Sequence, residues 1–315
     1  MKAKAIVFEA PKSLRVRELE LAPMGPTDLE VAVHFSGISA GTERLLWEGT
    51  MPPFPGLAYP LVPGYESVGE VARVGAEVHD FSVGDVVFLP GSYAFQGVQN
   101  IFGGAGERLV VPQDRAVRLA PSLGSKGVLL ALAATAHHVF TVGRAGAPLA
   151  YPDLIVGHGI MGRLLARMVV AAGRPAPVVG ETQAARQTGG LGYTVIHPDD
   201  DTRKDYRCIC DVSGDANILN RVIAKMSPGG EIVLAGFYKQ DLSFAYAPAF
   251  MREASIRVAA QWQKHDLEKV ATMFHDGSLS LDGLITHTET AENAAHAYEV
   301  AFSDPTCLKM VIKWV

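Results

Sequence analysis

Short hydrophobic runs enriched in β-branched residues, separated by polar and turn-forming positions, fill about the first 120 residues and predict an all-β region. Turn formers such as Pro11, Gly75 and Gly84 lie between the runs. Segment 49–64 contains five prolines and predicts an ordered loop, because proline fixes φ and lacks a backbone donor. The expected strands are Ala3–Phe8, Ser13–Glu18, Leu29–Ser36, Glu66–Val74, Asp85–Phe88 and Glu107–Val111.

The pattern changes at about residue 123, where helical periods begin to alternate with short apolar runs. Nearly continuous apolar strands between helices favour a doubly wound parallel sheet. A last helix is expected at Lys264–His275, followed by a strand-like tail, Leu308–Trp314. The other expected helices are Lys126–Thr141, Ile160–Ala172, Gln183–Gly189 and Asn217–Lys225, and the expected strands are Leu154–Val156, Ala176–Val179, Thr194–Ile196, Cys208–Val212, Glu231–Ala235 and Ile256–Ala259.

Length and pattern together predict two domains, since 315 residues correspond to about two units of roughly 150. We expect an α/β plus β architecture. An all-β domain spans 1–122 and is completed by 263–315, and a dinucleotide-binding domain spans 123–262.

The composition is that of a globular protein, with 48% hydrophobic and 19% charged residues. A net charge of −5 argues against general nucleic-acid binding, which requires a basic face. Three cysteines offer no disulfide framework and suit a reducing compartment. No signal peptide is visible, and no window approaches the roughly 20 apolar residues of a membrane helix. We therefore expect a cytoplasmic protein, for which peripheral membrane association remains open.

A glycine-rich turn is the strongest local motif. Gly157 would form the tight turn, Gly159 would let the backbone approach a pyrophosphate, and Gly162 would let the helix pack on the strand. The helix N-terminus would bind the phosphates. The motif directly follows a predicted strand and opens a predicted helix, and it reads Gly157-His158-Gly159-Ile160-Met161-Gly162.

A carboxylate is expected about 20 residues beyond such a turn, and Glu181 lies there. It would accept from the adenosine ribose hydroxyls and repel a 2′-phosphate, which favours NAD over NADP, although Arg186 nearby weakens that preference. The alternative is a structural turn with a solvated glutamate. Ser213, Gly236 and Phe237 follow later strands of the same sheet and are candidates to line the nicotinamide site; a core position is the alternative for Phe237.

Metal ligands are scarce in the sequence. Cys208 and Cys210 share one face of a predicted buried strand, with no further ligand nearby. The adjacent His137 and His138 point about 100° apart on a helix, which is unsuitable for chelation. His158 is expected to face phosphate or solvent. A zinc site of the usual Cys and His type is therefore not supported.

Several runs resemble the medium-chain dehydrogenase/reductase superfamily across essentially the whole chain. The resemblance implies a GroES-like all-β catalytic domain and a Rossmann-type cofactor domain. The runs are Ser36-Gly37-Ile38-Ser39, where zinc-dependent members have Gly-Ile-Cys; Gly64-Tyr65-Glu66-Ser67-Val68-Gly69-Glu70-Val71, which is similar to Gly-His-Glu-x-x-Gly-x-Val; and Val83-Gly84-Asp85-Val86-Val87.

The departures from this pattern are chemically important. Ser39 stands where zinc-dependent members have a ligand cysteine, Tyr65 where they have a ligand histidine, and Ala131 about where a third ligand falls. No four-cysteine lobe appears between Gly91 and Gly106. The resemblance therefore implies a zinc-free member.

A closer resemblance is to the hydroxyethyl bacteriochlorophyllide a dehydrogenase family. It implies oxidation of the ring-A 1-hydroxyethyl group to acetyl with NAD⁺, giving bacteriochlorophyllide a. The runs that carry it are Thr42-Glu43-Arg44-Leu45-Leu46-Trp47-Glu48-Gly49, Met51-Pro52-Pro53-Phe54-Pro55-Gly56, Tyr59-Pro60-Leu61-Val62-Pro63-Gly64-Tyr65-Glu66, Pro248-Ala249-Phe250-Met251-Arg252-Glu253-Ala254 and Leu284-Ile285-Thr286-His287.

Oxidation of an alcohol without zinc requires hydrogen-bonding groups at the developing carbonyl oxygen. We expect Tyr65 to be the principal donor and acceptor, assisted by Ser39 or Thr42. Glu66 or Glu43 would support them or release the proton. The alternative is that Tyr65 only packs or stacks against the substrate.

A flat, apolar macrocycle would require aromatic walls. The candidate substrate-binding residues are Trp47, Phe54, Tyr59, Tyr93 and Phe95, each with a core position as its alternative. Two other functions stay open. One is a zinc-free quinone or enone reductase of the same superfamily, and the other is a non-catalytic pigment carrier. The partner is expected to be a small bacteriochlorophyllide, and a homo-oligomer is not excluded.

Overall fold

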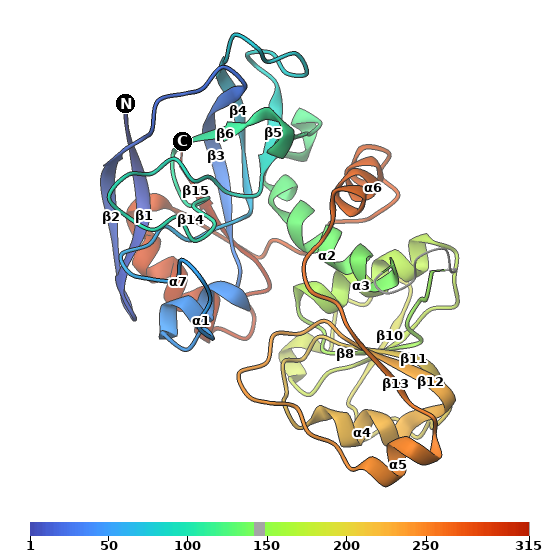
Figure 1. Cartoon of the computed structure of the whole chain (residues 1–315). Helices are drawn as coiled ribbons and strands as arrows, with labels where there is room; N and C mark the ends of the chain where they lie inside the picture. The colour runs from blue at the N-terminus through green and yellow to red at the C-terminus, as the bar shows by residue number, and fades with distance from the viewer. Residues whose placement is uncertain (142–148, 315) are drawn as a thin grey trace. The chain divides into compact units, whose positions relative to one another are not determined.

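The computed structural model describes residues 1–141 and 149–314 (Figure 1). The chain divides into two compact units. Unit 1 comprises Met1–Ala131, Phe274–Asp276 and Leu281–Val315, and unit 2 comprises Leu132–Met273 and Gly277–Ser280. Within the described ranges, no helix is long and apolar enough to cross a membrane.

Unit 1 is built on β-sheets. Strands β1 (Lys2–Ala10) and β2 (Ser13–Glu20) form an antiparallel pair. The larger sheet has the order β14-β15-β3-β4-β5-β7, and β6 also pairs with β3. Its strands are β3 (Asp28–Ile38), β4 (Ser67–Val74), β5 (Val86–Leu89), β6 (Arg108–Pro112), β7 (Val117–Arg118), β14 (His287–Thr290) and β15 (Met310–Lys313).

Two helices of unit 1 were not predicted from the sequence, and both matter for the site. Helix α1 (Thr42–Glu48) ends at Gly49, whose left-handed φ of 69° lets its N–H bond back to the last turn. Helix α7 (Ala294–Ser303) buries Ala294, Ala297 and Tyr298 on one face at helical spacing. Lys264–His275 is therefore not the last helix. The 3₁₀ segments of this unit are Gln113–Arg115, Pro121–Leu129, which is kinked at Gly124, and Ala291–Asn293.

Unit 2 is a six-stranded parallel sheet of order β10-β9-β8-β11-β12-β13, which confirms the predicted doubly wound fold. Figure 1 shows α2 and α3 on one face of this sheet and α4 and α5 on the other. The strands are β8 (Leu154–Val156), β9 (Val178–Gly180), β10 (Thr194–Ile196), β11 (Tyr206–Asp211), β12 (Met226–Leu234) and β13 (Ser255–Val258), and the helices are α2 (Leu130–Thr141), α3 (Ile160–Ala171), α4 (Ile218–Lys225), α5 (Tyr246–Met251) and α6 (Lys264–His275).

The expected helix at Gln183–Gly189 is wrong. Only a single 3₁₀ turn, η3 (Ala184–Arg186), forms there. Gly189, the last residue of the expected helix, adopts a left-handed φ of 82°. Side chains, including those of Arg163 and Gln187, hold the connection between β9 and β10.

The unit boundaries also differ from the expected 122 and 262. The turn Pro121–Leu129 packs on the sheet of unit 1, where a Cβ on Gly127 would lie 2.6 Å from the Leu119 side chain. Most of α6 belongs to unit 2, because the buried Asp266 accepts hydrogen bonds from His137 at 2.7 Å and His138 at 2.9 Å. The two histidines of α2 thus bind one carboxylate. With these contacts, the two units divide after residues 131 and 273.

Candidate active site

The glycine turn of unit 2 has the backbone geometry that phosphate binding requires. Gly157 follows β8 with a φ of 102°, a conformation that L side chains rarely adopt. A Cβ on Gly162 would lie 1.9 Å from the Gly157 carbonyl oxygen, so helix and turn are in direct contact. A Cβ on Gly159 would meet only the Arg186 guanidinium, at 3.9 Å. The backbone at Gly159 is therefore open to a ligand, and Ile160 and Met161 begin α3 directly after it.

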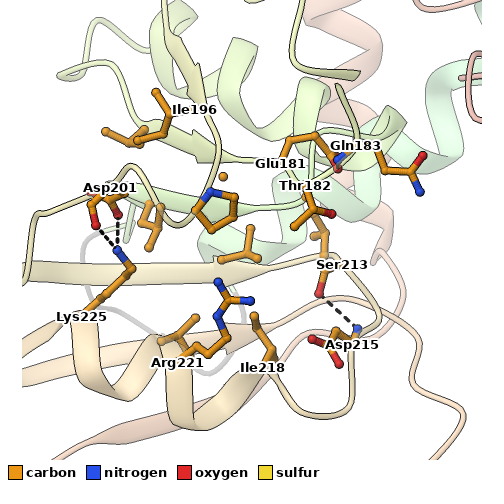
Figure 2. Close-up of a pocket in the computed structure, with 18 of the residues that line it drawn as sticks. Glu181, Thr182, Gln183, Ile196, Asp201, Ser213, Asp215, Ile218, Arg221 and Lys225 are labelled. Atoms are coloured by element: carbon orange, nitrogen blue, oxygen red, sulfur yellow. Dashed lines mark hydrogen bonds and ion pairs between the residues drawn. The ribbon is translucent and has the colours of Figure 1, made fainter. Parts of the chain in front are cut away.

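A pocket of about 280 Å³ lies beside this turn, at the carboxyl ends of β8, β9 and β11 (Figure 2). Ligands bind at this edge in doubly wound folds, where the strand order reverses. Figure 2 shows Glu181, Thr182 and Gln183 on one side of the pocket and Ile218 and Arg221 on another. The pocket therefore combines apolar walls with polar groups.

Glu181 is held in this pocket by the glycine turn itself. Its Oε2 accepts from the backbone N–H of His158 at 2.8 Å, and its Oε1 accepts from that of Gln183 at 2.8 Å. Each carboxylate oxygen has two acceptor sites, so both can accept a further hydrogen bond from a ligand hydroxyl. Arg186 lines the same pocket, which places a cation near the anion.

The expectation that the His158 side chain faces phosphate or solvent is wrong. The imidazole is fully buried. Its Nδ1 donates to the Arg186 carbonyl at 2.6 Å, and its Nε2 accepts from the Tyr193 hydroxyl at 2.8 Å. Burial lowers the pKa of His158 to about 4, so the ring is neutral near pH 7.

Ser213, Gly236 and Phe237 lie in adjoining segments beyond β11 and β12. The Ser213 hydroxyl donates to the Asp211 carboxylate at 2.7 Å, and Ser213 also lines the pocket. A Cβ on Gly236 would lie 3.1 Å from the Gly214 nitrogen. Phe237 is 47% exposed, so the alternative of a core position does not apply to it.

The candidate catalytic hydroxyls of unit 1 lie together. Ser39 follows β3, Thr42 begins α1, and Tyr65 lies just before β4. The Tyr65 and Ser39 hydroxyl oxygens are 2.6 Å apart, and Tyr65 donates to Thr42 Oγ1 at 3.4 Å. The Tyr65 ring also contacts Phe102 edge to face. Burial raises the pKa of Tyr65 above its usual value, so the phenol is protonated at neutral pH and can donate a hydrogen bond.

A buried carboxyl group, Glu43, lies next to these hydroxyls. Its Oε1 accepts from the Ser39 backbone N–H at 3.1 Å, and its Oε2 accepts from the Tyr298 hydroxyl at 2.8 Å. Burial raises the pKa of Glu43 to about 8, and the negative charge of Glu66 acts in the same direction. Glu43 can therefore bind or release a proton near neutral pH. Tyr298 was not predicted as part of the site.

Glu66 forms a buried ion pair with Lys309. The Lys309 ammonium donates to Glu66 Oε2 at 2.6 Å and to the Ile38 carbonyl at 3.0 Å. Within the part of the chain that the structure describes, Glu66 Oε1 has no hydrogen-bond partner. Burial raises the pKa of Glu66, and Lys309 opposes this shift. Sequence reasoning missed Lys309, although a lysine in an apolar strand is a signal for a buried anionic partner.

The aromatic candidates are divided by their exposure. Phe95 is 3% exposed and packs in the core, so its assignment as a wall residue is wrong. Trp47 packs against Phe8, and the Tyr59 hydroxyl donates to the Leu46 carbonyl. Phe54 and Tyr93 are 38% and 68% exposed, respectively. These two residues therefore keep the surface that substrate binding requires.

The groups around Tyr65 do not fit a zinc site of the usual type. They are hydroxyls and carboxyls, whereas zinc sites of that type are built from thiolates and imidazoles. Among residues 1–141 and 149–314, no three His, Cys, Asp or Glu side chains are grouped to bind a metal ion.

Comparison with known proteins identifies the family. Residues 25–121 match the alcohol dehydrogenase GroES-like domain. A 2-desacetyl-2-hydroxyethyl bacteriochlorophyllide A dehydrogenase from Rhodobacter capsulatus is 50% identical over 315 residues, which cover 100% of this chain and 99% of the relative. A protein of the same name from Cereibacter sphaeroides is 48% identical over 319 residues, with the same coverage. The chain belongs to this dehydrogenase family.

Solved structures of distant dehydrogenases confirm the fold predicted for this member of the bacteriochlorophyllide dehydrogenase family. L-idonate 5-dehydrogenase from Escherichia coli matches with a TM-score of 0.85 at 17% identity, covering 100% of this chain and 99% of that chain. 2R,3R-butanediol dehydrogenase from Bacillus subtilis matches with a TM-score of 0.84 at 20% identity, covering 99% and 100%. A GroES-like domain and a Rossmann-type domain are therefore both present.

Proposed function

We propose that this chain oxidises the ring-A 1-hydroxyethyl group of 3-hydroxyethyl bacteriochlorophyllide a to acetyl, with NAD as the hydride acceptor. The 50% identity over the full length of a dehydrogenase named for such a substrate carries this proposal. The alcohol carbon loses a hydride to NAD⁺, and the hydroxyl group loses a proton to the protein and then to solvent. Protein hydroxyls rather than zinc would contact the reacting oxygen, because the groups around Tyr65 are oxygen donors.

The pocket of unit 2 fits a dinucleotide. The open backbone at Gly159 and the N-terminus of α3 would bind the pyrophosphate, and Glu181 would accept from the adenosine ribose hydroxyls. The negative charge of Glu181 disfavours a 2′-phosphate, which supports NAD over NADP. When bound, the nicotinamide supplies the hydride acceptor. Ser213, Gly236 and Phe237 remain the candidates to contact it.

Tyr65 would handle the oxygen of the substrate. In the alcohol complex the phenol O–H points to Ser39 or Thr42, and the Tyr65 oxygen accepts the substrate hydroxyl proton as its own proton moves to that neighbour, which releases its hydroxyl proton in turn. Tyr65 then holds the proton from the substrate and donates a hydrogen bond to the new carbonyl oxygen. Glu43, with its pKa of about 8, is the proposed last group of the protein to hold the proton before its release to solvent, and the Glu66–Lys309 ion pair lies beside the site. Such hydrogen bonding is effective because the site is buried.

The first test follows both reactants in one anaerobic mixture of purified protein, NAD⁺ and 3-hydroxyethyl bacteriochlorophyllide a. We expect NADH formation to match a red shift of the pigment's long-wavelength band, and we expect both to persist with a zinc chelator. Pigment binding without NADH formation would refute the proposal and favour a carrier. Turnover only with NADPH and an enone would favour a reductase.

The second test is Tyr65→Phe, which removes one oxygen and keeps the ring. We expect kcat to fall about 100-fold to 1000-fold, as for the loss of other oxyanion donors, while pigment binding persists. Tyr246→Phe is the matched control, because this exposed tyrosine of α5 is not among the candidate site residues. Near-full turnover by Tyr65→Phe would show that Tyr65 has only a packing role.

A further inference from the structure

The connection between β9 and β10 forms one wall of the nucleotide pocket, yet it contains only one 3₁₀ turn. Backbone carbonyls in such a segment require donors from elsewhere when they are buried. Glu181, Gln183 and Arg186 of this connection all line the pocket. Whatever fixes the connection therefore also fixes the groups that meet the adenosine half of a dinucleotide.

A buried guanidinium from α3 supplies these donors. Arg163 is 5% exposed, and its Nη2 donates to the Thr188 carbonyl at 2.9 Å and to the Arg186 carbonyl at 3.4 Å. Its Nη1 donates to the Gly189 carbonyl at 3.3 Å, and its Nε donates to the His158 carbonyl in the glycine turn at 3.2 Å. A Cβ on Gly189 would lie 2.5 Å from Nη1, so this residue must be small. One side chain thus joins the glycine turn to the connection.

His158 and Tyr193 complete the same attachment. The His158 imidazole donates to the Arg186 carbonyl and accepts from the Tyr193 hydroxyl, and its backbone N–H donates to Glu181. The Gln187 side chain donates to the Glu181 carbonyl at 2.9 Å, which closes the loop on itself. Glu181, whose charge favours NAD, and Arg186, whose charge would attract a 2′-phosphate, are therefore both hydrogen-bonded to His158.

We propose that Arg163, His158 and Tyr193 are positioning residues that set the affinity and selectivity of the adenosine subsite. This inference rests on dinucleotide binding in the pocket and does not depend on the pigment. Arg163 and His158 both donate to the Arg186 carbonyl, and Arg163 also binds the Thr188 and Gly189 carbonyls that follow, whereas Glu181 has separate anchors on His158 and Gln183. Loss of Arg163 would loosen the segment 186–189 and let the Arg186 side chain approach a 2′-phosphate, while Glu181 stays in place.

The test is calorimetric titration of the full chain with NADH, NADPH and ADP-ribose. We expect Arg163→Met to bind NADH and ADP-ribose at least about tenfold more weakly, with a smaller preference for NADH over NADPH, because several hydrogen bonds are lost. Tyr193→Phe removes the hydroxyl that donates to His158 and also bonds to Arg167, and should weaken NADH binding by about three- to tenfold. Arg163→Lys should bind NADH more tightly than Arg163→Met does, because one ammonium can reach some of the same carbonyls.

The kinetic signature separates positioning from general damage. We expect KM for NAD to rise with kcat and the pigment KM unchanged, and Arg174→Met, an exposed arginine of the same unit, to behave as wild type. Unchanged NADH affinity in both Arg163→Met and Tyr193→Phe would overturn the inference. A parallel loss of kcat, pigment binding and melting temperature would also overturn it. A wild-type chain that binds NADH but leaves the pigment unoxidised would refute the proposed function alone.

Discussion

The buried pair of Glu66 and Lys309 makes a quantitative prediction. In Lys309→Met, the Glu66 carboxylate keeps its burial and loses the ammonium at 2.6 Å, while its other oxygen already lacks a partner among the described residues. Removing one member of a buried ion pair typically costs about 3–5 kcal/mol of unfolding free energy. We expect a loss in this range at pH 8.

The loss should depend on pH in a defined direction. Burial raises the pKa of Glu66, and Lys309 opposes this, so the variant raises that pKa further. A group with a raised folded pKa supports folding below its unfolded pKa, roughly 4.3 for Glu, and this support disappears as the pH rises through the folded value. Lys309→Met should therefore lose less unfolding free energy at pH 5 than at pH 8.

Urea unfolding at both pH values, followed by circular dichroism, measures the loss, and hydrogen exchange of β3 amides reports on unit 1 by itself. The control is the double variant Glu66→Gln/Lys309→Met, which removes both charges and should recover much of the stability. A loss below about 1 kcal/mol, or an equal loss at pH 5 and pH 8, would refute the reasoning.

Two further predictions concern the same site. If Glu43 accepts the proton, its pKa of about 8 requires kcat to rise with pH through this value, and Glu43→Gln should give a low, flat pH–rate profile; an unchanged rise would exclude Glu43. Gly37→Ala should lower the unfolding free energy by about 1–3 kcal/mol, because its Cβ would lie 2.2 Å from Glu66 Oε2. Gly41→Ala, whose Cβ meets nothing within 4 Å, is the control in the same thermal unfolding experiment. Equal melting temperatures for the two variants would contradict the predicted clash.

The fold of unit 2 was predictable because its information is local. Buried parallel strands are short apolar runs, and the glycine turn marks where the first of them meets its helix. The helix expected at Gln183–Gly189 failed for a reason that is not local. Arg163, more than 20 residues earlier, binds the carbonyls of Arg186, Thr188 and Gly189, which therefore do not accept helical hydrogen bonds.

The candidate active site was predictable only in part. Ser39, Thr42 and Tyr65 were found because they lie in or beside runs that resemble a known family, and the structure brings them together. Lys309 and Tyr298 were not found, because they reach Glu66 and Glu43 across 243 and 255 residues of sequence. Tertiary contacts of this range leave no periodic pattern near either partner.

The position of β15 has a consequence for the order in which the chain can fold during synthesis. This strand lies between β14 and β3 and brings Lys309 to Glu66, so the sheet of unit 1 closes only after residue 313 has left the ribosome. Unit 2 has all its residues by position 280. Domains usually fold as units, and the one synthesised first folds first. Here the unit that begins synthesis first is completed last. Strand β3 lacks its partner β15 until all of unit 2 has been synthesised.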